Sequence, residues 1–260
     1  MTDLSPASPP GPSGADPLAD LRANLALIET RIAAACARSD RARGEVRLLP
    51  VSKTVSSERL RLAYAAGCRQ LGENKVQEAW NKSRELADLA DLRWSVIGHL
   101  QTNKARVVAR FAHEFQALDS LRLAEELDRR LQAEGRSLEV LVQVNTSAEP
   151  SKYGLPPDEV AAFMRALPAF QSLRVRGLMT LAIFSEDHQR VRQCFVRLRE
   201  LRDRLRQEVH AAIQLDQLSM GMSGDFELAI EEGATIVRIG QAIFGARGLP
   251  DAHYWPGNNG

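Results

Sequence analysis

Short apolar runs alternate with longer amphipathic segments along most of this chain of 260 residues. A first helix is predicted over 17–39, because Leu21, Leu25, Ile28 and Ile32 recur at helical spacing. Eight later runs are typical of short strands: VRLLPVS, RQLGE, RWSVIG, FQALDS, LEVLVQVN, VRGLMTL, LDQLSMG and TIVRIG. Helices are expected to follow them, beginning near Ser57, Asn74, Gln101, Leu121, Pro156, Asp187, Gly224 and Gln241.

Hairpin signals are almost absent between these strands, and several of the runs are apolar throughout. Parallel strands need crossover connections, and strands that are covered on both faces are continuously apolar. Eight strand–helix units therefore predict an α/β fold, a single (β/α)8 barrel. An open doubly wound sheet is the alternative. In a barrel, the chemistry is expected in the loops that follow the carboxyl ends of the strands.

The two ends of the chain depart from this pattern. Ten of the first 17 residues are Pro, Gly or Ser, so residues 1–17 are expected to form a disordered leader. Residues 250–260 are expected to form a flexible tail. Residues 18–249 then remain for one barrel domain.

Composition and charge narrow the classes of function. Hydrophobic residues make up 44% and charged residues 26% of the chain, as in globular proteins, and the formal net charge is +1. Because this balance gives no bulk field, neither nucleic acid nor a membrane is expected as a partner. Cys36, Cys68 and Cys194 are too widely spaced to indicate a disulfide framework or a metal site. The chain shows no signal peptide or membrane-spanning run, and a cytoplasmic location is expected.

Lys53 directly follows the apolar run LLPVS, at the end of a predicted strand. Burial at such a place disfavours the charged form of a lysine, and a neutral amine attacks aldehydes to form a Schiff base. The alternative is an ordinary strand-end lysine that reaches solvent.

A phosphate site is predicted in the loops after the last two strands, GMSGD and VRIGQAIFG. Hydroxyls and backbone amides of Ser219, Ser223, Gly240 and Gln241 are the expected donors, and in barrels these two loops frequently hold phosphate. The alternative is structural: the glycines permit tight turns, and Ser223 caps a helix.

Two further polar residues lie at strand ends. Arg238, within the apolar run IVRIG, needs a partner, which is either a carboxylate such as Glu73 or a ligand. Asn74 either caps the helix that follows it or positions a ligand.

Common nucleotide, hydrolase and zinc signatures are absent: the chain has no GxxxxGKS/T, GxGxxG, GxSxG or HExxH. The arginine-rich stretch 190–206 is expected to be a solvated barrel helix, because Val191, Leu198 and Leu205 share one apolar stripe and acidic residues interleave with the arginines.

Seven segments resemble a known family when taken in order: LLPVSKT, GENKVQEAW, IGHLQTNK, NTSAEPSKYG, RGLMT, LSMGMSGDFELAI and TIVRIGQAIFGAR. Over 21–247 the chain is similar to the pyridoxal phosphate homeostasis proteins, the YggS-like or proline synthetase co-transcribed group. The resemblance implies a single barrel like the N-terminal domain of alanine racemase, with pyridoxal 5'-phosphate (PLP) held as a Schiff base. Ser95 departs from the family pattern, in which a histidine is expected at that place.

The resemblance also implies roles for the candidate residues. Lys53, the lysine of the VSKT motif, would carry PLP, and Arg238 would face the pyridine nitrogen. The remaining cofactor-binding residues would be Asn74 beside the cofactor and, at the phosphate, Gly240, Gln241 and Ser219, Ser223 or both.

Binding PLP does not by itself define a reaction. An arginine at the pyridine nitrogen disfavours its protonation and makes the ring a poorer electron sink, and the additional domain that supplies a tyrosine base in alanine racemases is not expected here. We therefore expect a monomeric protein, without catalytic residues, that stores, buffers or delivers PLP, with PLP-dependent apoenzymes as partners. The alternatives are a low-activity amino-acid racemase that uses Lys53 and Tyr153, and a cofactor-free Schiff-base aldolase.

Overall fold

Eight parallel strands form one sheet in the computed structural model, which describes residues 16–149, 152–208 and 213–245. The strands are β1 (Arg47–Pro50), β2 (Gln70–Glu73), β3 (Arg93–Val96), β4 (Glu114–Leu118), β5 (Leu138–Gln143), β6 (Leu173–Met179), β7 (Gln217–Ser219) and β8 (Ile236–Ile239). All eight coincide with predicted runs.

The strands follow the order β1-β8-β7-β6-β5-β4-β3-β2, and a parallel bridge between Val51 and Gly72 joins the ends of β1 and β2. Ser52 N donates to Gly72 O at 2.9 Å across the same junction. Neighbours in sequence are thus neighbours in space around a nearly closed ring. The predicted (β/α)8 barrel is confirmed, and the open doubly wound sheet is wrong.

Helices surround the strands. The α-helices are α1 (Pro17–Arg38), α2 (Ser57–Ala65), α3 (Val76–Glu85), α4 (Ala105–Phe111), α5 (Leu121–Ala133), α6 (Val160–Ala166), α7 (His188–Glu208), α8 (Phe226–Glu231) and α9 (Gln241–Phe244). The 3-10 helices are η1 (Arg43–Glu45), η2 (Thr102–Lys104) and η3 (Leu167–Ala169). The start predicted near Pro156 is wrong: the two prolines belong to a turn, and α6 begins at Val160.

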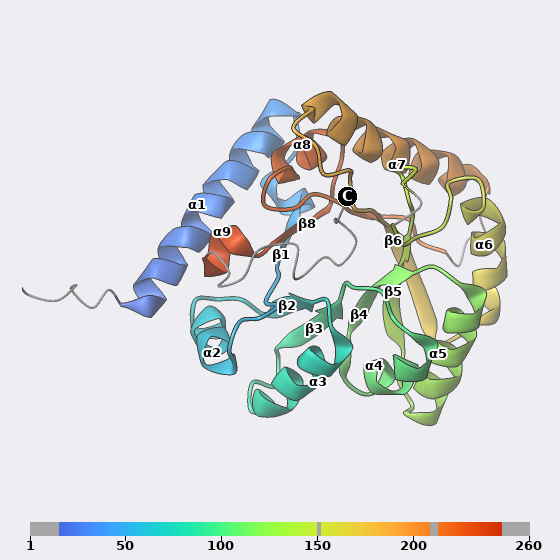
Figure 1. The fold of residues 1–260 in the computed structure, drawn as a ribbon, viewed down its shortest axis with the longest axis horizontal. Coiled ribbons are helices and arrows are strands. Elements are labelled where there is room, and N and C mark those ends of the chain that lie inside the picture. Colours follow the sequence, from blue (N-terminus) through green and yellow to red (C-terminus); the bar gives the residue numbers. More distant parts are fainter. Residues whose placement is uncertain (1–15, 150–151, 209–212, 246–260) are drawn as a thin grey trace, which may run out of the picture.

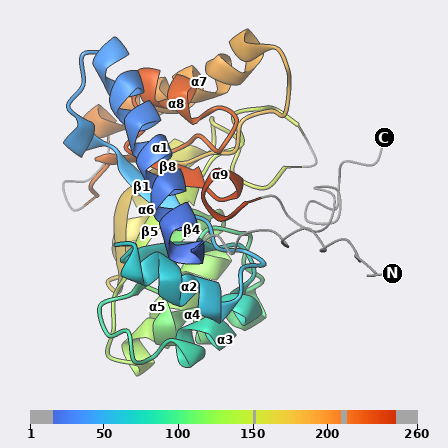
Figure 2. The same ribbon diagram turned by 90° about the vertical axis from the view of Figure 1, so that its left-hand side faces the viewer.

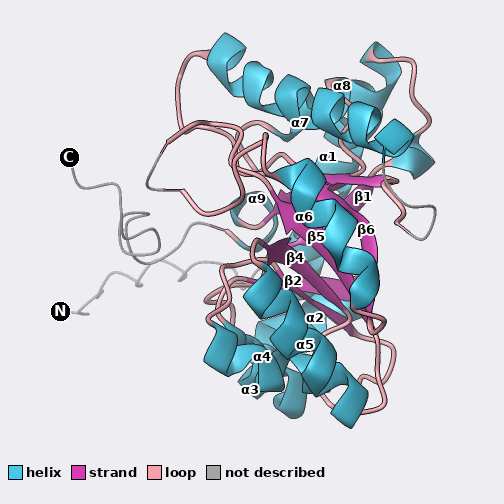
Figure 3. Ribbon diagram, turned by 90° about the vertical axis from the view of Figure 1, so that its right-hand side faces the viewer, coloured by secondary structure: helices cyan, strands magenta, loops and turns pink. Residues whose placement is uncertain are grey.

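Two groups of helices cover the barrel on opposite sides. In Figure 1, α1, α8 and α7 arch over one side of the strands, while α2, α3, α4 and α5 cover the other. Figure 3 shows the strands enclosed between these layers. The first helix lies beside the last in Figure 2, where Asn24 Nδ2 of α1 donates to Ile243 O of α9 at 3.0 Å.

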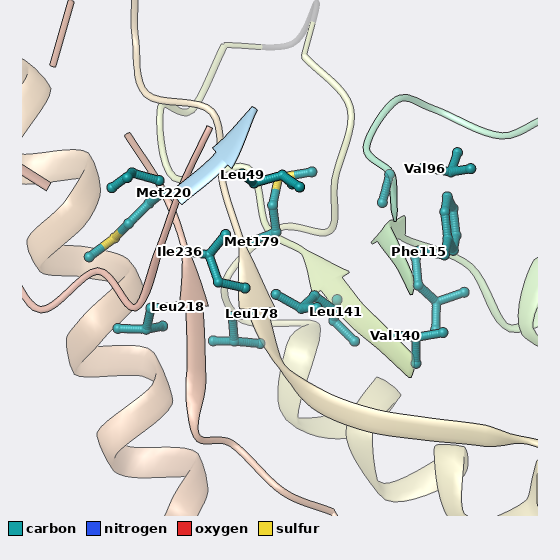
Figure 4. Close-up of a cluster of buried hydrophobic side chains, with 14 of the residues drawn as sticks. Leu49, Val96, Phe115, Val140, Leu141, Leu178, Met179, Leu218, Met220 and Ile236 are labelled. Atoms are coloured by element: carbon teal, nitrogen blue, oxygen red, sulfur yellow. The ribbon is translucent and has the colours of Figure 1, made fainter. Parts of the chain in front are cut away.

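Apolar side chains from several strands fill the core. Leu49, Phe115, Leu141 and Ile236 belong to the cluster in Figure 4, and each is at most 1% exposed. Removing such side chains from water stabilises the fold by about 25 cal/mol per Å².

Helix α7 confirms the expectation for the arginine-rich stretch. Val191 and Leu198 are buried against the barrel, whereas Arg192 pairs with Glu231 and Glu232 of the α8 region, at 2.6 Å each. The stretch is therefore a barrel helix whose arginines meet acidic neighbours. In the described part of the chain, we find no helix long and apolar enough to cross a membrane.

The leader predicted for residues 1–17 lies outside the described residues except for Asp16 and Pro17, where Asp16 caps α1 and Pro17 begins it. The tail predicted for residues 250–260 also lies outside them.

Candidate functional site

Lys53 lies directly after β1, in the turn that leads to α2, and is only 7% exposed. Thr54 has a φ of 66° in this turn, and its N–H donates to Glu78 Oε1 at 2.6 Å. Lys53 lines a cavity of about 310 Å³ together with Gly240 and Gln241, which follow β8. The structure thus brings together three residues that the sequence singled out.

Arg59 of α2 also lines this cavity, and the sequence analysis missed it. Its Nε is buried and has no hydrogen-bond partner among the described residues. No carboxylate is among the described residues that line the cavity, whose charged side chains are Lys53 and Arg59. The cavity is therefore complementary to an anion. The sequence offered one signal for this role: Arg59 lies in the first turn of the helix that follows Lys53.

Gly240 allows β1 and β8 to approach closely at the cavity. A Cβ atom at this position would lie 2.9 Å from Val51 O, so any side chain would push the two strands apart. Gly221, in the loop after β7, has a φ of 93°, and a Cβ there would meet Ala229 Cβ at 2.7 Å. Both loops of the predicted phosphate site thus depend on glycine.

Arg238 is buried inside the barrel, 3% exposed. It is the register partner of Leu49 of β1, so both side chains leave the same face of the sheet. Its Nη1 donates to Ser219 Oγ at 2.6 Å, and its Nη2 donates to Thr180 O at 2.8 Å. Burial lowers the pKa of Arg238 to about 10, opposed by the charge of Asp225, so the guanidinium remains a cation at neutral pH.

Ser219 stands behind Arg238. Its hydroxyl accepts from Arg238 and donates to Gln116 Oε1 at 2.6 Å. The single proton of the hydroxyl is therefore committed inside the barrel, and a phosphate, which accepts hydrogen bonds, would compete with Gln116 for it. Ser223, in the loop after β7, is partly exposed. Ser223 does not cap α8, whose N-cap residue is Asp225, so the capping alternative is wrong.

Glu73 is not the partner of Arg238, so this alternative is wrong. Successive side chains of a strand alternate between faces, and Glu73 points away from the barrel interior towards α3. There Lys82 Nζ donates to Glu73 Oε1 and Ser52 O at 2.8 Å and to Glu78 Oε1 at 2.6 Å. Burial raises the pKa of Glu73 above its ordinary value, and the attraction of Lys82 acts in the opposite direction.

Asn74 does not cap the helix after it. The N-cap residue of α3 is Lys75, and no side chain caps the helix. Asn74 Oδ1 is buried without a hydrogen-bond partner among the described residues, and a buried acceptor of this kind is costly unless a ligand satisfies it. The chain packs tightly behind it, because a Cβ at Gly98 would lie 2.2 Å from Asn74 O.

Tyr153 stacks on His99, with ring centroids 4.0 Å apart and planes inclined by 9°. His99 Nδ1 lies 3.6 Å from Asp119 Oδ2. Burial raises the pKa of Asp119, and the charge of His99 opposes this shift. The Tyr153 side chain is 59% exposed, so the tyrosine considered as a racemase base stands largely in solvent.

The chain is similar to known proteins over nearly all of its described length. A family model for the alanine racemase N-terminal domain matches residues 19–248. The pyridoxal phosphate homeostasis protein of Aquifex aeolicus is 42% identical over 223 residues, which cover 86% of this chain and 96% of that protein. The protein of the same name from Escherichia coli K12 is 40% identical over 234 residues, covering 88% and 97%.

Solved structures show the same similarity. PipY of Synechococcus elongatus with PLP bound superposes with a TM-score of 0.78 at 36% identity, covering 86% of this chain and all of that one. Alanine racemase of Streptomyces coelicolor shares the fold, with a TM-score of 0.65 at 20% identity; the match covers 88% of this chain and 59% of the racemase.

Proposed function

The chain belongs to the family of pyridoxal phosphate homeostasis proteins, as its motifs predicted, and on this premise we propose that it binds PLP through Lys53 and takes part in the intracellular homeostasis of this cofactor. One observation carries the proposal: a buried lysine and an arginine line one cavity, with no carboxylate among its described lining residues. PLP carries an aldehyde and a phosphate, which match these two side chains in chemistry.

Lys53 is the residue that attaches the cofactor. Its amine would hold PLP, whose aldehyde would supply a group that condenses with an amine with loss of one water molecule. The tight turn at Thr54 holds the lysine at the carboxyl end of β1, where barrels bind their ligands.

The phosphate end is held by the loops around Lys53. Arg59 supplies a positive charge, and Gly240 and Gln241 bring the backbone close to the cavity. Ser223 is the serine that we assign to the phosphate, since the Ser219 proton is donated to Gln116.

The ring end is held inside the barrel. Arg238, held by Ser219, would face the pyridine nitrogen, and a cation at this place would disfavour protonation of the ring. Asn74, whose buried oxygen has no hydrogen-bond partner among the described residues, would lie beside the cofactor. When bound, PLP supplies an electron sink, and an unprotonated ring is a weak one. The protein therefore stores, buffers or delivers PLP without substantial catalysis.

The partners of this function are PLP and the PLP-dependent apoenzymes that receive it, and the protein acts as a monomer in the cytoplasm. Cys36, Cys68 and Cys194 are free and buried, which supports a reducing compartment.

Borohydride reduction of the protein incubated with PLP tests this proposal. The label is expected on the Lys53 peptide by mass spectrometry, and Lys53→Met is expected to lose it completely. Lys104→Met, which alters an exposed lysine of η2, serves as the control and keeps the label.

A transfer assay then tests the homeostasis role. The loaded protein is expected to activate a PLP-dependent apoenzyme, in comparison with free PLP at the same concentration. Steady exchange of amino-acid α-protons in deuterated water that depends on Lys53 would instead support the racemase alternative and contradict the proposal.

A further inference from the structure

Buried polar side chains form a continuous hydrogen-bonded chain through the inside of the barrel. Arg47 Nη2 donates to Glu114 Oε2 at 2.5 Å, and Gln116 Nε2 donates to Glu114 Oε1 at 2.5 Å. Gln116 Oε1 accepts from Ser219, whose oxygen accepts from Arg238, at 2.6 Å each. We call these five residues the interior chain. It begins at Arg47, which is partly exposed at the start of β1, and ends at Arg238 near the carboxyl end of β8.

Glu114 sets the direction of the bonds that connect it with Arg238. An ionised carboxylate only accepts hydrogen bonds, so Gln116 must turn its NH2 group towards Glu114 and its oxygen towards Ser219. Ser219 must then donate to that oxygen, which leaves a lone pair on its hydroxyl for Arg238. The three bonds from Arg238 to Glu114 therefore run in one direction, and aligned buried bonds polarise and strengthen one another.

The charge of Glu114 is itself held in place. Its side chain is 1% exposed, and Arg47 pairs with it from the amino end of the barrel. Ser95 Oγ donates to Glu114 Oε1 at 3.0 Å and accepts from Gln70 Nε2 at 2.7 Å. Ser95, the position where the family resemblance led us to expect a histidine, thus anchors the interior chain.

We propose that Glu114 and Gln116 are positioning residues that act through Ser219 to aim the Arg238 guanidinium at the ring of the bound cofactor. This inference rests on the proposed function, because it gives Arg238 the role of facing PLP. Two of the five guanidinium N–H groups are directed to Ser219 and Thr180, and these two bonds fix the plane of the cation. Without Gln116 Oε1 as its acceptor, the Ser219 hydroxyl rotates, and its hydrogen atom is no longer held away from the Arg238 N–H group that donates to the same oxygen.

The inference predicts that an interrupted interior chain loosens Arg238 and lets the pyridine nitrogen take up a proton. Gln116→Met removes both links at nearly constant volume, and Ser219→Ala removes the next link along the chain. Gln143→Met is the matched control, since Gln143 is a buried glutamine of β5 whose amide donates to Tyr153 O outside the interior chain.

The experiment uses the full-length protein loaded with PLP that carries ¹⁵N in its ring, and it measures the nitrogen chemical shift at one pH. Gln116→Met and Ser219→Ala are each expected to move the signal towards that of a protonated ring. The double variant moves it no further than the larger single effect, because both changes break the same chain. Gln143→Met leaves it in place. Thermal unfolding of each variant shows that the fold is kept.

The possible failures are distinguishable. Failure of the wild-type protein to bind PLP would overturn the proposed function and the inference with it. Bound PLP with an unchanged nitrogen signal in folded Gln116→Met and Ser219→Ala would overturn the inference alone. If Gln116→Met does not fold, Ser219→Ala decides, since it removes only one oxygen atom from the core.

Discussion

Two buried lysines lie near the carboxyl end of β1, and the residues described around them differ in charge. Lys82 of α3 is enclosed by three oxygen acceptors, from Ser52, Glu73 and Glu78. Lys53 turns instead to a cavity where the other charged lining residue described is also a cation. The two lysines are buried to nearly the same extent: Lys82 is 6% exposed and Lys53 is 7% exposed. The comparison teaches that the neighbours of a buried lysine, rather than its depth, separate a structural cation from a ligand-binding amine.

The largest expected effect is the loss of stability when Lys82, the structural lysine, is replaced. Lys82→Met leaves two carboxylates near each other without their cation, and loss of one partner of a buried ion pair costs about 3–5 kcal/mol. Urea denaturation is expected to show this loss in the free energy of unfolding. Lys53→Met, which leaves both carboxylates paired with Lys82, provides the contrast, and a loss in that variant as large as that in Lys82→Met would contradict the distinction.

A smaller effect is expected on the ligand-binding side. Arg59→Gln removes the second cation of the cavity while keeping an N–H donor, and a hydrogen bond to a charged group contributes about 1.5–3 kcal/mol. The affinity for PLP is expected to fall roughly tenfold or more, measured by absorbance titration. Pyridoxal, which lacks the phosphate, serves as the control ligand and is expected to bind both proteins alike. An equal loss of affinity for PLP and pyridoxal would show that Arg59 maintains the shape of the cavity and does not bind the phosphate.

The smallest expected effect is a pH dependence of the free energy of unfolding, caused by Glu73, the partner of Lys82. Because burial raises the folded-state pKa of Glu73 above its ordinary value of 4.5, the folded protein keeps a proton that the unfolded chain has released. The free energy of unfolding is therefore expected to fall as pH rises from 4.5 through the folded pKa. Glu73→Gln removes this component. Urea denaturation of the wild-type protein and of Glu73→Gln at several pH values tests this prediction. If the free energy of unfolding changed with pH in the same way in both proteins, the raised pKa of Glu73 would be contradicted.

Much of the barrel and part of the site follow from local sequence. Several strands are short apolar runs, and barrel geometry places all carboxyl strand ends at one rim, which brings Lys53, Gly240 and Gln241 together. The helix start at Ser57 was predicted, yet the direction of Arg59 depends on the exact phase of α2 and on its packing.

The interior of the barrel could not be predicted in this way. Ser219 was considered for the phosphate because it lies near a strand end. Its actual partner, Gln116, is 103 residues away, and their contact depends on the register of strands that are not neighbours. Likewise, Glu73 was considered for Arg238 because both lie at strand ends, whereas the alternation of side chains in β2 turns it outward to Lys82.

The contacts of Lys82 with Ser52 and Glu73 lie at the junction of β1 and β2. A flat sheet of these eight strands would leave β1 and β2 as edges with unpaired backbone groups, which recruit strands from other molecules. Here the edges meet through the Val51–Gly72 bridge, and the Ser52 hydroxyl reaches Glu73 across it at 2.6 Å. Side chains thus reinforce the short backbone junction that leaves neither β1 nor β2 as an open edge.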